Sequence, residues 1–140
     1  MINLTNLPVT KTPAECKELL DALNSVITGA EAFIAEKIGG TTLSRRVSWP
    51  ARTIGERFPE LKDCIMLFVG IDSESDHLPI DVTYSMTPEF ELQVERELAE
   101  LDKFYREDIG RICRTILDTL PAARTAIQAR FEHMTTGWLP

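Results

Sequence analysis

Apolar residues recur every three or four positions along two long segments of the chain. Each segment opens with threonine followed by proline. The threonine hydroxyl can cap the first helical turn, and proline is tolerated there because its missing N–H would have no partner in that turn. The first segment ends at Gly39-Gly40 and the second at Pro121, residues that typically terminate helices. We therefore predict amphipathic helices over residues 13–38 and 88–120.

Shorter apolar patterns lie around and between these helices. Residues 64–71 form an unbroken apolar run, and residues 78–84 alternate apolar and polar side chains, so both are predicted to be strands of a hairpin. Residues 41–48 also alternate and are a candidate third strand. Shorter helices are predicted over residues 50–58 and 122–133. The predicted fold class is α+β, with two long helices, a small two- or three-stranded sheet and two lesser helices.

The second long helix is longer than the domain that should contain it. At 1.5 Å per residue it would extend about 50 Å, whereas a compact domain of this length is roughly 37 Å across. The helix must therefore bend, for which Gly110 is the expected place, or protrude, or lie along a partner. A homodimer formed through the helix would use its apolar stripe at Leu98, Leu101 and Tyr105.

Composition places the chain among ordinary globular domains. The hydrophobic fraction is 44% and the charged fraction 26%, which suits a single domain over residues 1–140. We see neither an apolar run long enough to cross a bilayer nor the basic and apolar blocks of a signal peptide. The three cysteines are widely separated, which predicts free thiols and a cytoplasmic location.

The net charge of −7 is unevenly distributed. Residues 63–108 carry 13 carboxylates and 3 cations, whereas residues 41–62 carry 5 cations and 2 carboxylates. The acidic block argues against nucleic acid or an anionic membrane as the main partner and suits a basic protein, although it also suits a merely well-solvated surface. The residues expected to form the acidic binding face are Asp72, Glu74, Asp76, Asp81, Glu91 and Glu95.

The basic segment offers an alternative site at Arg45, Arg46, Trp49 and Arg52. Arginine and tryptophan are common anchors of protein interfaces, and they also bind phosphate groups or stacked bases. No glycine-rich phosphate loop accompanies them. The alternatives for this segment are therefore a small anionic ligand or nucleotide, or ion pairs with the acidic block of the same chain.

No pattern in the chain indicates catalysis or metal binding. Asp72, Glu74 and Asp76 have the spacing of a calcium loop, but His77 and Thr83 replace its glycine and final glutamate. We therefore predict no metal and no cofactor, and favour a non-catalytic protein over an enzyme. The leading hypothesis is a cytoplasmic interaction protein of the inhibitor or immunity type, whose acidic face binds a basic protein partner. An anionic-ligand protein and a helix-mediated homodimer are the alternatives.

Overall fold

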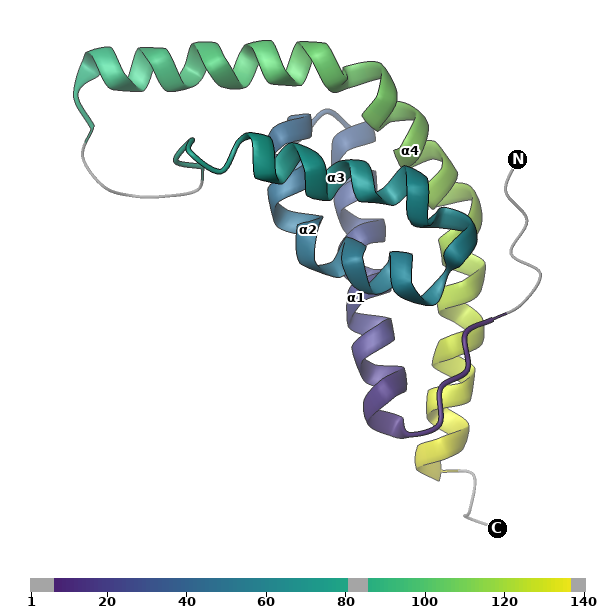
Figure 1. Cartoon of the computed structure of the whole chain (residues 1–140). Helices are drawn as coiled ribbons and strands as arrows, with labels where there is room; N and C mark the ends of the chain where they lie inside the picture. The colour runs from purple at the N-terminus through teal and green to yellow at the C-terminus, as the bar shows by residue number, and fades with distance from the viewer. Residues whose placement is uncertain (1–6, 81–85, 137–140) are drawn as a thin grey trace.

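The computed structural model describes residues 7–80 and 86–136 (Figure 1). This part of the chain contains four α-helices and one short 3-10 helix, and it contains no strand. The fold is therefore all-α, and the predicted α+β class is wrong. The elements are α1 (Pro13–Ile34), α2 (Gly40–Arg57), η1 (Pro59–Leu61), α3 (Lys62–Glu74) and α4 (Pro88–Thr136).

The strand predicted over residues 41–48 and the helix predicted over residues 50–58 together form α2. Its buried apolar side chains recur with a helical period at Leu43, Val47, Ala51 and Ile54. A spacing of four residues satisfies both a strand pattern and a helix pattern, which explains the wrong prediction. Trp49, which the strand would have placed beside Leu43 and Val47, is instead exposed.

The strand predicted over residues 64–71 lies within α3. Its buried side chains recur at helical spacing and are Ile65, Phe68, Val69 and Ile71. An unbroken apolar run, by contrast, has no period of its own from which to choose between helix and strand. Of the strand predicted over residues 78–84, only residues 78–80 are described; they form no strand, and the others lie outside the described residues.

Helix α1 begins as predicted and ends earlier than predicted. The side chain of Thr12 accepts a hydrogen bond from the backbone N–H of Glu15, which caps the first turn. The helix ends at Ile34, and the chain then turns through Glu36, which has a φ of 60°. At Gly29 a Cβ atom would lie 2.7 Å from Leu43 Cδ1 of α2, so glycine allows the close approach of these two helices.

Helix α4 continues through Pro121, so the helices predicted over residues 88–120 and 122–133 are one helix of 49 residues. A proline in a helix interior costs about 3 kcal/mol or more. Burial of one large aliphatic side chain contributes about 1.5–3 kcal/mol. The residues around the proline that are buried in the core are Ile116, Leu120, Ala123 and Ile127. Together these contacts outweigh the cost of the proline and keep the helix intact.

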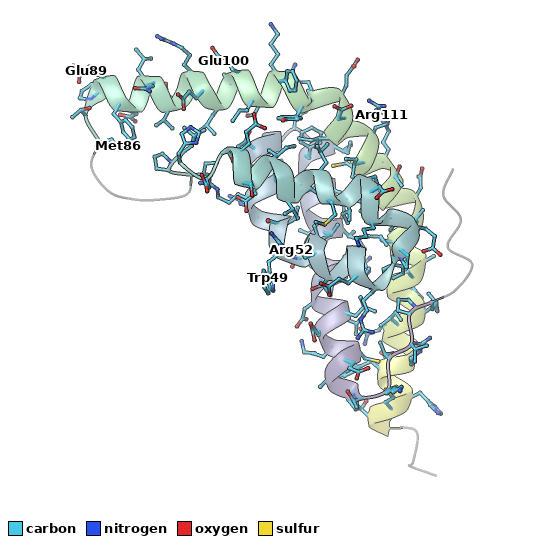
Figure 2. All side chains as sticks on the ribbon, viewed as in Figure 1. Trp49, Arg52, Met86, Glu89, Glu100 and Arg111 are labelled. Atoms are coloured by element: carbon cyan, nitrogen blue, oxygen red, sulfur yellow. The ribbon has the colours of Figure 1, made fainter. Side chains whose placement is uncertain are left out.

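Helix α4 both bends and protrudes. Its direction changes between Glu100 and Arg111, the interval that contains Gly110 (Figure 2). After the bend α4 packs mainly against α1, and before the bend it extends beyond the other helices (Figure 1). We call residues 88–104 the arm.

A carboxylate ties the base of the arm to the start of α2. Asp102 Oδ1 accepts hydrogen bonds from the backbone N–H of Thr41 at 2.8 Å and from its hydroxyl at 2.6 Å. The N-cap residue of α2 is Gly39, which has no capping side chain, so Asp102 supplies the cap from another helix. A Cβ at Gly39 would lie 2.4 Å from Asp102 Oδ2, so a larger residue would displace the carboxylate.

We expect Asp102→Ala to lower the free energy of unfolding by about 1–3 kcal/mol, because it leaves the Thr41 donors without their charged acceptor. Urea denaturation measures this change. The matched control is Asp108→Ala on the same helix, which removes only an exposed pair with Arg111 and should cost about 0–1 kcal/mol. Equal losses for the two variants would contradict a capping role for Asp102.

Candidate interaction surface

The arm and the C-terminal end of α3 border an open groove of about 370 Å³. We call it the arm groove. It combines acidic and apolar side chains contributed by the arm and by the residues at and just after the end of α3. The lining residues are Glu74, His77, Glu97, Glu100, Leu101 and Phe104.

Two side-chain contacts hold the arm and its base against the end of α3 and the residues just after it. His77 Nε2 lies 3.1 Å from Glu97 Oε2, and the hydroxyl of Tyr105 donates to the carboxylate of Glu74. The second contact raises the pKa of Tyr105, because the hydrogen bond to Glu74 favours the neutral phenol. Glu74 therefore shares one surface with Glu97 and Glu100 of the arm.

One side of the arm helix faces the arm groove. At roughly 100° per residue, the lining residues Glu97, Leu101 and Phe104 fall within an arc of roughly 60°, and Glu100 lies roughly 40° beyond its edge. The two cations of the arm, at positions 96 and 103, lie more than roughly 100° from the centre of this arc. The groove side of the arm therefore carries Glu97, Leu101 and Phe104 away from the arm cations, whereas Glu100 lies at its edge, one helical turn after Arg96.

The arm also leaves large apolar side chains in water. The exposed fraction is 76% for Phe104, 56% for Leu92 and 40% for Phe90. By contrast, Leu98 and Leu101 are half-buried, and Tyr105 packs against the core. The stripe predicted to form a homodimer is thus partly turned toward its own bundle, and the most exposed aromatic ring of the arm is Phe104, next to it.

The structure separates the acidic residues that the sequence grouped together. Glu74 lines the arm groove, Asp76 is exposed after α3, and Asp72 pairs with Arg45. Glu91 and Glu95 are exposed, and helical spacing puts them roughly 110–150° around the arm from the groove side. Asp81 lies outside the described residues.

Glu97, Glu100 and Phe104 line the groove but were not among the residues predicted from the sequence. The spacing of 97, 101 and 104 is that of one helical face, so a helical projection of the arm would have grouped Glu97 and Phe104 with Leu101. Number and charge along the chain do not distinguish Glu97 and Glu100 from the other acidic residues of the arm, whereas the side of the helix that they occupy does.

The basic segment does not converge into one site. Arg45 is half-buried, lies 3.4 Å from Asp72 Oδ1, and donates to the backbone carbonyls of Leu78 and Ser75. These bonds stabilise the chain where α3 ends. Because they occupy the guanidinium group, Arg45 is unsuited to bind an anion. Trp49 and Arg52 instead project outward from α2 (Figure 2). Arg46, three residues before Trp49, is also exposed.

The thiols of the chain are free and poorly reactive. Cys16 and Cys113 are buried, and Cys64 is half-buried. Burial raises the pKa of Cys113 to about 12 and also raises the pKa of Cys64, so both stay protonated at neutral pH. Within residues 7–80 and 86–136 no three histidine, cysteine, aspartate or glutamate side chains are grouped so that they could hold a metal ion. No helix in these residues has the length and apolar content needed to cross a membrane.

Comparison with known proteins does not assign a function. No protein-family model, curated protein or solved structure matches this chain. The inference of function therefore depends on the geometry and the charge of the surfaces described above.

We expect Arg45→Ala to lower the free energy of unfolding by about 1–3 kcal/mol, because Asp72 and two carbonyls lose their donor. The control is Arg52→Ala on the same helix, which is exposed and should change stability by less than about 0.5 kcal/mol. Chemical denaturation at neutral pH compares the two. If the two variants were equally stable, Arg45 would not have the structural role assigned to it.

The pKa of Cys113 predicts a loss of stability in alkali. Above the ordinary thiol pKa of 9.0 the unfolded chain releases a proton that the folded chain retains up to about pH 12. The free energy of unfolding should therefore fall as pH rises, by up to about 1.4 kcal/mol per pH unit for this group. Urea titrations between about pH 9 and pH 10.5 should show a shallower fall for Cys113→Ala than for the wild type. Parallel slopes would contradict the prediction.

Proposed function

We propose that this chain is a non-catalytic, cytoplasmic protein-interaction protein whose arm groove binds a basic segment of a partner protein. The observation that carries the proposal is the combination, in one groove, of three carboxylates with the exposed ring of Phe104. The free thiols support a cytoplasmic location, since such thiols persist in a reducing compartment.

The groove has the chemistry to hold a lysine or arginine side chain. Glu100 has no hydrogen-bond partner within the described part of the chain, so its carboxylate is available to a cation. Glu74 and Glu97 each accept one bond already, and an ionised carboxylate can accept several more. The ring of Phe104 adds a face on which a cation can rest, worth about 0.5–1 kcal/mol at an exposed site.

The charge around the groove would also attract a basic partner. Residues 86–104 carry six carboxylates and two cations. A surface of one sign raises the rate at which an oppositely charged protein finds it, and it also disfavours acidic partners. An inhibitor or immunity-type role, in which the arm neutralises a basic protein, is the biological role that this surface suits.

Peptides selected from a random display library against the whole chain provide a direct test. We expect the enriched sequences to carry lysine or arginine next to an apolar residue, because the groove offers carboxylates beside Phe104 and Leu101. Fluorescence anisotropy with one enriched peptide then measures its affinity. Glu97→Lys with Glu100→Lys should weaken binding at least about tenfold, the loss of about 1.4 kcal/mol.

The matched control reverses Glu91 and Glu95 to lysine. It changes the net charge of the arm by the same amount but on another side of the helix, so it should weaken binding by less than the groove variant does. Circular dichroism establishes that both variants remain folded. The proposal fails if selection shows no enrichment of basic residues, or if the two double variants lose the same affinity.

A further inference from the structure

The outer face of α2 is a second exposed surface, and its chemistry is opposite to that of the arm groove. Trp49 has an exposed fraction of 78%, the highest among the large hydrophobic side chains of the described residues. Arg52 follows at i+3 on the same helix, is exposed, and makes no hydrogen bond or ion pair with the described residues. Tryptophan and arginine are the residue types most enriched at the energetic centres of protein interfaces.

These two surfaces do not meet within one molecule. Trp49 on α2 and Phe104 on the arm are each about three-quarters exposed in the same structure, with exposed fractions of 78% and 76%. The bonds from Asp102 to Thr41 fix the base of the arm at the start of α2, and the arm extends away from there. In the view of Figure 2, Trp49 projects from the side of the bundle toward which the arm extends.

We infer that the arm groove binds the outer face of α2 in a second copy of this chain, with Trp49 and Arg52 as the anchoring residues. The inference rests on the proposed function, because it names a partner for the same groove. Arg52 supplies the cation for Glu100, and Trp49 covers the exposed ring of Phe104. Charge complementarity between the carboxylates of the arm groove and Arg52, which has no partner among the described residues, selects this occupant over a third, unrelated surface.

Each copy presents both surfaces, so the contact can form twice. When the arm of each copy binds α2 of the other, the two contacts are related by a two-fold axis and the assembly closes as a dimer. Each copy also carries a net charge of −7, which opposes association over long distances. At an ionic strength of about 0.15 M the screening length is about 8 Å, so the distant repulsion is damped while contacting pairs remain.

Sedimentation equilibrium at this ionic strength tests the inference with the full chain. We expect the wild type to form dimers at micromolar concentrations. Trp49→Ala, Arg52→Glu and Glu100→Arg should each raise the dimer dissociation constant at least about tenfold. All three positions are exposed, so the variants should remain folded, which circular dichroism checks.

An exchange of charges makes the test specific for this pair of surfaces. Homodimers of Arg52→Glu or of Glu100→Arg would hold two repulsive contacts. A mixture of the two variants would hold one contact with its charges exchanged and one wild-type contact, so mixing should restore dimers. The control mixture pairs Arg52→Glu with Trp49→Ala, two variants that each weaken the dimer and whose charges do not complement each other, so mixing them should not restore dimers.

Several results would overturn the inference. The wild type could stay monomeric at all concentrations tested, or the three variants could form dimers as tightly as the wild type. The control mixture could also restore dimers as well as the charge-exchanged mixture does. A monomeric wild type that still binds the selected basic peptides through Glu97 and Glu100 would reject only the second copy as partner. Failure of the peptides as well would reject the proposed function itself.

Discussion

The constraint from which the other features follow is that α4 is far longer than the helix that covers it. At 1.5 Å per residue, its 49 residues extend about 73 Å and the 22 residues of α1 about 33 Å. Helix α1 therefore buries only the part of α4 after the bend. The remaining 88–104 segment extends beyond the bundle, with Phe90, Leu92 and Phe104 exposed to water.

The contacts at the base of the arm decide which side of the arm helix is available to a partner. Asp102 caps α2, and Tyr105 donates to Glu74. The partly buried hydrogen bonds to the Asp102 carboxylate contribute about 1.5–3 kcal/mol each, whereas the exposed Tyr105–Glu74 and His77–Glu97 contacts contribute less. The base is therefore held firmly, and the groove side of the arm takes its position from it.

The candidate site could be predicted only in part. The sequence showed that the region around residues 63–108 is acidic and that its long helix exceeds a compact domain. It offered ion pairs between the basic segment and the acidic block as one alternative, which holds for Arg45 and Asp72. It did not show that Arg45 would also bind the carbonyls at the end of α3, because residues 41–48 and 64–71 have strand-like patterns and these bonds depend on their forming helices. Nor did it show that Glu97, Glu100 and Phe104 share a groove with Glu74, since that depends on the placement of the arm.

Local signals in the sequence determined where helices begin, and their apolar period determined which faces they bury. The Thr-Pro starts of α1 and α4 are correct, because a cap and a fixed φ act within a single turn. The tertiary structure decided the secondary structure wherever local signals were ambiguous or were opposed by packing. It made helices of residues 41–48 and 64–71, and it carried α4 through Pro121, because burial in a shared core contributes more than one proline costs.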